Sequence, residues 1–410
     1  MSNDRSQDWC QTFLSECVDS LDAGTSVNSE DRPHGSGEIG VLKTSAVSGG
    51  KFHANENKAV NPSEKIHASE PVRGGSILIS RMNTPDLVGE SCFVAEDWPE
   101  LFLPDRLWQV KANDSSRINM KWLAYILQGW HARQYIKRNA TGTSGSMKNL
   151  AKSRLLAMPI SLPSPSEQNR IAEILETLEA QIHAVEQIVA KLKFTRKGMI
   201  NDLLGKDWIL SSVDEQFEIK SGITLGPHRL PKDDASGYLR VANVQRGAIR
   251  MAEVARLQAS PSERQGYRLA QDDLLIVEGH ADINQIGRCA RVGDEAAGLL
   301  YQNHLFRLRP RTMNAVFAEA WLNSQYAMDY WRATCTSSSG LNTINSRQLK
   351  NMLIAVPPYT EQLSIASIID QYQRRMDSEV EGLEKLHALK EGLMEDLLSG
   401  RVRVPVETSV

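Results

Sequence analysis

Side chains that could perform acid–base, nucleophilic or metal chemistry are present, but they form no familiar catalytic pattern. Nine histidines are scattered without a His-Glu-x-x-His motif, and no Gly-x-x-x-x-Gly-Lys-Ser/Thr phosphate loop occurs. Asp272, Asp273 and Glu278 have a spacing that could suit a nuclease, but no lysine follows Glu278 and the first half lacks matching acids. The sequence therefore predicts no catalytic residue in this chain.

The five cysteines are also not arranged for chemistry. They are odd in number, widely separated and without a Cys-x-x-Cys pair, which favours reduced thiols over disulfides or zinc. They are Cys10, Cys17, Cys92, Cys289 and Cys335. We expect no metal site.

One short motif resembles part of an enzyme site. Val356-Pro-Pro-Tyr359 is similar to the Asp/Asn-Pro-Pro-Tyr motif of amino-group DNA methyltransferases, in which the first side chain accepts a hydrogen bond from the target amine. Valine cannot accept that bond. We interpret the motif as a turn before a helix.

Composition indicates a globular protein with more than one core. The chain has 410 residues, of which 41% are hydrophobic and 24% charged, and its net charge is -3. The polar N-terminus and the lack of any run near the ~20 apolar residues of a membrane span predict a soluble, cytoplasmic protein without membrane contact.

The elements that must position any functional residues are two long helices. From Glu167 to Leu204, apolar residues recur at alternating steps of four and three, which is typical of a coiled-coil seam. Pro163 and Pro165 should block helix before this segment, Ser166 could cap it, and Gly205 should end it. At ~1.5 Å per residue the rod is roughly 57 Å long and needs a partner helix.

The partner is an internal repeat. Adding 194 to positions 163–204 reproduces the segment at 357–398 without a gap, so that Glu167-Gln168 returns as Glu361-Gln362. Val185 is the departure, because Glu379 takes its place and only the adjacent Val380 could replace it. The predicted seam comprises Ile171, Leu175, Leu178, Ile182, Val189, Leu192, Ile365, Ile369, Tyr372, Met376, Leu383 and Leu386.

The blocks before and between the helices are also related to each other. Each has short β-rich runs separated by turn residues (76–80 and 107–110; 273–277 and 305–308), then an aromatic-rich helix (120–136; 316–331). A Ser/Thr/Gly loop follows in both. The fold class predicted is α+β, with two mixed domains joined by two long antiparallel coiled-coil helices and an internal pseudo-two-fold repeat.

Two kinds of function fit such a plan. Arginines and amide side chains in polar loops could contact phosphates and base edges of DNA. The alternative is a DNA-free coiled-coil adaptor or protein-binding scaffold with solvated loops. Composition alone leaves both open.

The doubled motifs favour the first kind. The Pro-x₃₋₄-Glu-Gln-x-x-Ile-Ala openings, the heptad helices, the Gly-x-x-x-Asp-Leu-Leu endings and the closing segment 397–404 resemble the DNA specificity subunit of Type I restriction-modification systems. The resemblance covers nearly the whole chain. It implies that two target recognition domains each read half of a split double-stranded DNA site.

The same resemblance implies a set of partners. Two methyltransferase (modification) subunits would dock on the helices, which also fix the distance between half-sites, and restriction/translocase subunits would join them. S-adenosylmethionine, ATP and Mg²⁺ would bind to those partners, so we expect no cofactor on this chain and no enzyme activity of its own.

The corresponding domain borders are 1–160 for the first recognition domain, 161–205 for the central helix, 206–356 for the second recognition domain and 357–404 for the C-terminal helix. The resemblance assigns no base-contacting residue, so the DNA-binding candidates are basic and polar residues in loops next to strands. They are Lys43, Thr44, Arg81, Asn83, Arg106, Thr143, Ser144, Lys148, Arg240, Asn243, His280, Asn284, Asn303, His304, Ser338 and Asn342.

Overall fold

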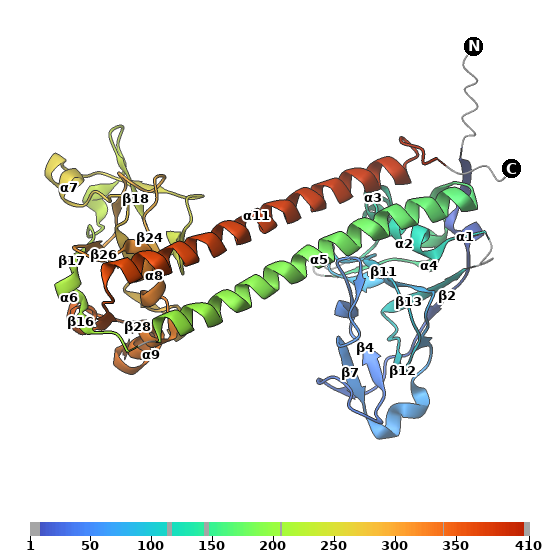
Figure 1. Cartoon of the computed structure of the whole chain (residues 1–410). Coiled ribbons are helices and arrows are strands. Elements are labelled where there is room, and N and C mark those ends of the chain that lie inside the picture. The colour runs from blue at the N-terminus through green and yellow to red at the C-terminus, as the bar shows by residue number, and fades with distance from the viewer. Residues whose placement is uncertain (1–8, 113–116, 143–146, 206, 339, 406–410) are drawn as a thin grey trace, which may run out of the picture. The chain divides into compact units, whose positions relative to one another are not determined.

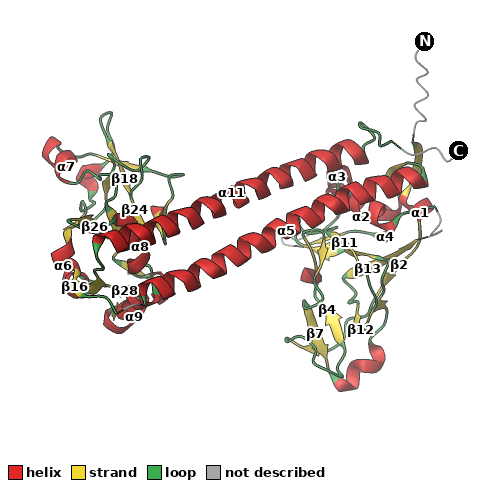
Figure 2. Cartoon of the chain, in the orientation of Figure 1, coloured by secondary structure: helices red, strands yellow, loops and turns green. Residues whose placement is uncertain are grey.

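The computed structural model describes residues 9–112, 117–142, 147–205, 207–338 and 340–405. These residues form two compact units, of which the first comprises Met1–Val185 with Gly382–Val410 and the second Glu186–Glu381. Helices α5 (Pro165–Leu204) and α11 (Tyr359–Leu398) each contribute one half to each unit (Figure 1). The predicted α+β class is confirmed, with the strands confined to the two blocks (Figure 2).

The first unit contains two main sheets. The four-stranded sheet has the order β11-β9-β13-β2, formed by Ser91–Phe93, Ile77–Ser80, Leu107–Ala112 and Val18–Ala23. The five-stranded sheet has the order β3-β7-β4-β12-β8, formed by Ser29–Glu30, Asn57–Val60, Gly40–Leu42, Trp98–Phe102 and Pro71–Val72. A separate pair joins β1 (Cys10–Phe13) to β15 (Pro159–Leu162), at the two ends of the block.

The second unit repeats this topology in shorter form. Its four-stranded sheet has the order β17-β26-β22-β24, formed by Phe217–Ser221, Leu305–Pro310, Leu274–Val277 and Cys289–Arg291. Its three-stranded sheet has the order β21-β18-β25, formed by Ala255–Leu257, Ser236–Leu239 and Leu300–Tyr301. The pair β16–β29 (Leu210–Ser212 with Leu353–Ala355) matches β1–β15.

A close backbone approach recurs at the same place in both units. A Cβ atom at Gly24 would lie 1.6 Å from the carbonyl oxygen of Leu103, and one at Gly222 would lie 2.3 Å from that of Tyr301. Any side chain at these two positions would collide with backbone. Gly24 and Gly222 therefore serve the same packing requirement in the two units.

The aromatic helix of each block is two helices rather than one. In the first unit α2 (Met120–Gln128) ends at Gly129 and α3 (Trp130–Asn139) begins directly after it. In the second unit α8 (Ala315–Leu322) and α9 (Gln325–Thr334) are separated by two residues. The expected continuous helices at 120–136 and 316–331 are therefore wrong, although fully buried Trp122 and Trp331 do anchor them in the core.

The start of α5 also differs from the prediction. Pro165 is the first helical residue, a position where its missing N–H costs nothing. The Ser164 hydroxyl accepts a hydrogen bond from the backbone N–H of Glu167 at 3.3 Å, so Ser164 rather than Ser166 caps the helix.

Within each unit the half-helices run antiparallel. In the first unit Ile171 shares a core cluster with Leu397, whereas Glu179, later in α5, pairs with Lys390, earlier in α11, at 2.5 Å. In the second unit Leu204 shares a core cluster with Ile365 and Ile369.

The seam is buried most deeply near the blocks. Eight predicted seam residues are buried: Ile171, Leu175, Leu178, Ile182, Val189, Leu192, Ile365 and Ile369. The four others are half-buried: Tyr372, Met376, Leu383 and Leu386. Val380 is exposed and does not take the place left by Glu379.

Candidate nucleic-acid interface

Polar side chains meet where strand β9 of the first unit ends. The chain continues from β9 through Arg81 into β10 (Met82–Asn83), and the backbone N–H of Arg81 donates to the carbonyl of Arg106 at 3.0 Å. Asn83 lies directly opposite Lys148 of β14 (Lys148–Asn149). Because residues directly opposite each other in antiparallel strands are close neighbours, Arg81 with Arg106 and Asn83 with Lys148 form two adjacent pairs. We call these four residues the first platform.

The second unit builds the same arrangement from other residues. The backbone N–H of Glu278 donates to the carbonyl of His304 at 3.0 Å, and His280 of β23 (Gly279–His280) lies opposite Asn342 of β28 (Leu341–Thr343). We call Glu278, His280, His304 and Asn342 the second platform. The structure groups these eight residues into two matched sets of four. Seven of the eight, all except Glu278, are among the predicted DNA-binding residues.

The first platform is rich in unpaired positive charge. Among the residues that the structure describes, Arg81, Arg106 and Lys148 form no ion pair. The Arg81 guanidinium carbon lies 5.6 Å from the ring centre of Trp108, and its Nε is buried without a hydrogen-bond partner. Three cations without a compensating acid favour a negatively charged or acceptor-rich partner.

The second platform is internally paired. His304 Nδ1 lies 2.8 Å from Glu278 Oε2, and the Asn342 side chain donates to the carbonyl of Ala281 at 2.9 Å. The ring Nδ1 of His280 accepts from the backbone N–H of Asp282 at 3.0 Å. These contacts fix the side chains while leaving His304 largely exposed.

The strand registers correct the sequence match between the blocks. Val110 of β13 and Leu308 of β26 occupy equivalent positions in the two sheets. Val110 pairs with Ile77 of β9, and Leu308 pairs with Leu274 of β22. Ile77 therefore corresponds to Leu274, which is an offset of 197 positions between β9 and β22. The counterpart of Arg81 is therefore Glu278. Matching the apolar runs Ile77-Leu78-Ile79 and Leu275-Ile276-Val277 by sequence predicts Gly279 instead, which is wrong by one residue. Glu278 is the platform residue that the prediction missed, because its acidic type was considered only for nuclease chemistry.

The acids proposed for nuclease chemistry lie apart. Asp273 precedes β22, is buried and pairs with Arg309 at 2.7 Å, whereas Glu278 follows the same strand at its other end. Asp272, in a left-handed backbone conformation, pairs with Arg291 at 2.9 Å. Within the described ranges, no group of three or more His, Cys, Asp or Glu side chains could hold a metal ion.

Four predicted DNA-binding residues lie away from the platforms, in the 3₁₀ turns that follow β4 and β18. Lys43 precedes η1 (Thr44–Ala46) and pairs with Asp31 at 3.3 Å. Arg240 precedes η4 (Val241–Asn243) and lies 3.5 Å from Glu253. Asn243 differs from the prediction because it is buried. Its side-chain oxygen accepts a hydrogen bond from the N–H of Arg240, and its side-chain nitrogen donates to two carbonyls of its own loop, so Asn243 shapes the turn.

The remaining candidates differ in how free their side chains are. The Asn284 side chain bonds to Arg332 at 2.8 Å and to Asp282 at 3.1 Å, so it is engaged within the unit. Asn303 is half-buried next to His304. Thr143 and Ser144 lie outside the described residues, and the side chain of Ser338 does too.

The arginines of the second block mainly stabilise the fold. Arg288 is buried and donates to the carbonyls of Val241 and Val244, and this burial lowers its pKa. Other arginines of this block pair with acids of the same unit: Arg229 with Glu263, Arg264 with Asp234, and Arg307 with Glu218. The arginine content of this block is therefore no measure of its affinity for DNA.

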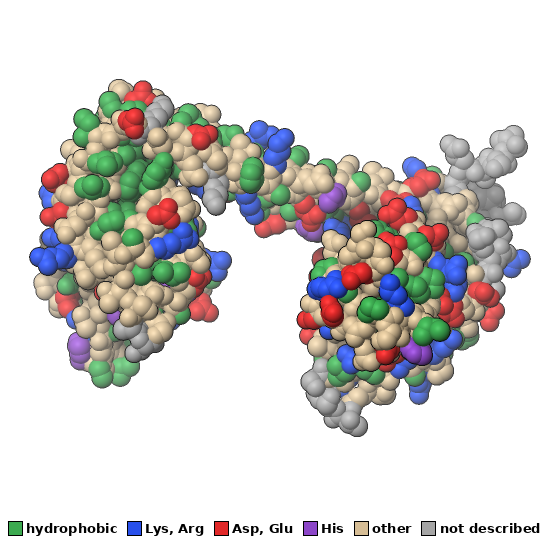
Figure 3. Space-filling view, turned by 90° about the horizontal axis from the view of Figure 1, so that it is seen from below, with side chains coloured by type: hydrophobic (Ala, Val, Ile, Leu, Met, Phe, Trp, Pro, Cys, Tyr) green, Lys and Arg blue, Asp and Glu red, His purple; other side chains and the backbone are tan. Residues whose placement is uncertain are grey.

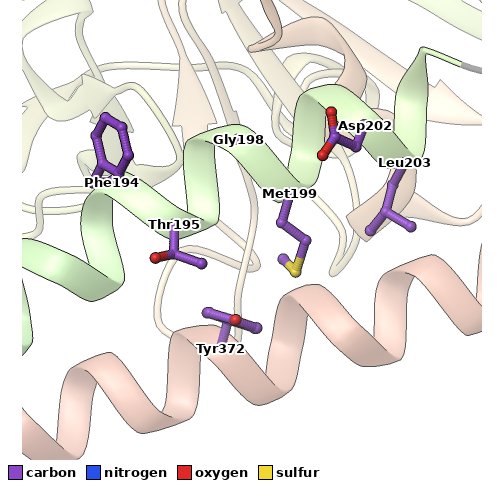
Figure 4. Close-up of a pocket in the computed structure, with 7 residues that line it drawn as sticks. All are labelled: Phe194, Thr195, Gly198, Met199, Asp202, Leu203 and Tyr372. Atoms are coloured by element: carbon purple, nitrogen blue, oxygen red, sulfur yellow. The ribbon is translucent and has the colours of Figure 1, made fainter.

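A shallow groove between the two helices of the second unit is a different kind of surface. Met199 and Tyr372 point toward one another from α5 and α11, whereas Phe194 points away and is exposed (Figure 4). The lining is mostly apolar and offers one carboxylate, Asp202. This groove is part of the helix seam and lacks the converging polar groups of a ligand site.

Part of the chain matches a known protein family. Residues 7–193 match the family described as Type I restriction modification DNA specificity domain. This segment of the chain is similar to members of that family. The resemblance predicted from the doubled motifs is thus confirmed.

Two relatives each match about half of the chain. The Type I restriction enzyme EcoKI specificity subunit of Escherichia coli (strain K12) is 26% identical over 57% of this chain and 55% of its own length. The EcoEI specificity subunit of Escherichia coli is also 26% identical, over 47% of this chain and 32% of its own length. The chain thus spans less than two thirds of these two relatives.

The solved structures extend the similarity of fold to nearly the whole chain. The Type I restriction-modification S subunit from M. genitalium covers 97% of this chain and 98% of its own length, with 14% identity and a TM-score of 0.57. A chain from a study of complex assembly and conformational transition of the Type I R-M system covers 97% and 99%, with 16% identity and a TM-score of 0.60. Over the described ranges, no helix is long and apolar enough to cross a membrane.

Proposed function

We propose that this chain is the non-catalytic specificity subunit of a Type I restriction-modification complex, reading a bipartite double-stranded DNA target with its two units. The observation that supports this most directly is the pair of matched platforms, which occupy one backbone position in both units but carry different side chains. A repeated scaffold with divergent polar residues is what two readers of different half-sites require.

The remaining components of the reaction belong to partners in this proposal. Methyltransferase subunits bring S-adenosylmethionine and modify adenine, and restriction subunits use ATP and Mg²⁺. The complex would work in the cytoplasm. The chain contributes the recognition surfaces and the helices on which the partners assemble.

The test is the methylated motif of the assembled complex. The chain is combined with its methyltransferase partner, and modified adenines are mapped in DNA of random sequence. A split motif is expected, and exchanging residues 208–356 for the matching block of a relative should change one half only. No sequence preference would support the DNA-free adaptor, and a change in both halves would contradict independent readers. Methylation by the isolated chain would contradict the non-catalytic role.

A further inference from the structure

The two platforms carry opposite hydrogen-bonding polarity at equivalent positions. Arg81 of the first platform corresponds to Glu278 of the second, and Arg106 corresponds to His304, by the register of β9 with β13 and of β22 with β26. A guanidinium offers only donors, and an ionised carboxylate offers only acceptors. A chemical group that suits one position cannot suit the other.

The carboxylate limits what the second platform can contact. Glu278 Oε2 is held by His304 Nδ1 at 2.8 Å, which orients the carboxylate and leaves Oε1 available to accept a further bond. A phosphate would be repelled by this charge, so a backbone contact at Glu278 is disfavoured. In the major groove the groups that donate are the amino groups of cytosine and adenine.

The first platform has the reverse requirement. Arg81 is positioned by Trp108, Arg106 is exposed, and among the described residues neither has an acidic partner. Guanine presents two acceptors, O6 and N7, which match the guanidinium fork. A phosphate would also accept these bonds, but it carries no sequence information.

We infer that Arg81 and Glu278 are specificity-determining residues at equivalent places in the two half-sites, Arg81 selecting guanine and Glu278 selecting an amino-bearing base, cytosine or adenine. This inference rests on the proposed function. It predicts that an exchange of polarity at one platform changes one base of one half-site and leaves the other half-site intact.

The experiment uses the full complex of this chain with its methyltransferase partner, incubated with randomised DNA and read by sequencing the bound and methylated fraction. Glu278→Gln should relax one position of one half-site, with a loss of discrimination on the order of tenfold, as expected for one base contact. Glu278→Arg, which copies the first platform, should change the preferred base there to guanine. Glu295→Gln is the matched control, since Glu295 is exposed in the loop after β24, at the opposite end of the sheet.

A second pair of variants tests the first platform. Arg81→Gln should relax a guanine in the other half-site, while Arg73→Gln, at the opposite end of β9, should leave the motif unchanged. Equal weakening on every sequence would mean that Arg81 contacts phosphate and would overturn its assignment. A thermal unfolding curve for each variant separates a lost contact from a lost fold, and Glu278→Gln keeps the shape of the side chain if Glu278→Arg does not fold.

The outcomes separate the inference from the proposed function. If the wild-type complex methylates no split motif, the proposed function itself is contradicted. A split motif that does not respond to Glu278→Gln, or that does not move toward a G·C pair in a folded Glu278→Arg variant, would overturn only the inference.

Discussion

The backbone N–H of Asn119 donates a 2.8 Å hydrogen bond to the side-chain oxygen of Gln168, joining the cap of α2 to the first turns of α5. The second unit repeats the contact between Asn314 and Gln362 at 2.9 Å. Both glutamines are buried, and each also donates to the carbonyl of the proline five residues earlier. The glutamine of the repeated Glu-Gln motif is therefore a clamp between block and helix.

Replacing this clamp should loosen the block to which it belongs. In Gln168→Leu the N–H of Asn119 loses its acceptor, and a buried unsatisfied group costs about 1–3 kcal/mol. Hydrogen exchange should accelerate at the start of α2, whereas α8 of the second unit should stay protected. Gln362→Leu should give the mirror result, and Gln181→Leu, on an exposed face of α5, serves as the control. Equal exchange in all variants would show that the clamp is dispensable.

The glutamate of the same motif has different surroundings in its two copies. Glu167 is buried and accepts two hydrogen bonds from Arg403, at 2.6 and 2.9 Å, and one from the Trp9 ring at 3.2 Å. Glu361, its counterpart, is exposed. The C-terminal tail thus binds the start of the first block, and Arg403 also lies over Trp9 at 5.5 Å.

Removing Arg403 should therefore destabilise the first unit. Arg403→Ala leaves the carboxylate of Glu167 buried without its cation, a loss on the order of 3 kcal/mol. The double variant Glu167→Gln with Arg403→Ala should recover part of this loss, because no buried charge remains. Denaturant unfolding of the four proteins gives the coupling, and Arg401→Ala is the control for an exposed tail arginine. Additive losses would mean that the pair is not coupled.

These contacts show what the sequence could and could not predict. The heptad seam was predictable because a period of three and four residues reflects which helix face is buried, and Leu175 and Ile365 are indeed buried. The offset between β9 and β22 was not, because runs of similar apolar residues match equally well at 197 or 198 positions. Only the hydrogen bonds to β13 and β26 decide between them.

The sequence predicted which types of residue form the candidate site better than it predicted what each residue does there. Asn243 and Asn342 are both polar residues in loop-rich segments, yet one is buried in its turn and the other lies on the second platform. A polar side chain can satisfy nearby backbone or face solvent, and a local pattern does not distinguish these outcomes. Glu278 and its partner His304 are 26 residues apart in the chain, so no local pattern links them.

Three buried thiols should make the protein sensitive to alkaline pH, because burial also raises the pKa of Cys289 well above its usual value. Burial raises the pKa of Cys17 to about 11 and that of Cys92 to about 12. In the unfolded chain a thiol ionises near pH ~8.5, so the stability linked to these protonated thiols is present below that pH and is lost as the pH rises toward 11 or 12. The free energy of unfolding should fall between pH 9 and pH 11, and Cys92→Ala should make the fall shallower.

Thiol labelling gives an independent measurement of the same burial. Exposed Cys10 should react with a disulfide reagent in the native protein, whereas Cys17, Cys92 and Cys289 should react only after unfolding. Rapid native labelling of these three would contradict their burial.

The helix pairing of the first unit should fail when a charge enters its seam. Leu178 is buried on α5, and Leu178→Asp would place an unpaired carboxylate there, with an expected loss of several kcal/mol. Thr177→Asp, on the exposed side of the same turn, is the control. Circular dichroism melting should show a lower Tm for the first variant alone. An unchanged Tm for Leu178→Asp would count against the pairing.

The salt dependence of DNA binding should come from the first platform more than from the second. Acidic and basic side chains are interspersed on the face of each unit seen in Figure 3, so neither unit shows a single-sign field there. The isolated chain should therefore bind DNA weakly with a shallow salt slope, because the slope scales with the phosphates neutralised. Lys148, a point charge without an ion-pair partner among the described residues, is suited to a phosphate.

Lys148→Gln should reduce the slope of log affinity against log salt by about one, uniformly across sequences. Asn342→Gln, at the matched position of the second unit, should leave the slope unchanged because no charge is lost. Lys137→Gln is the control, since Lys137 already lies 3.4 Å from Asp86. Titration of the assembled complex at several salt concentrations measures all four slopes. A steep slope that Lys148→Gln does not alter would place the phosphate contacts outside the first platform.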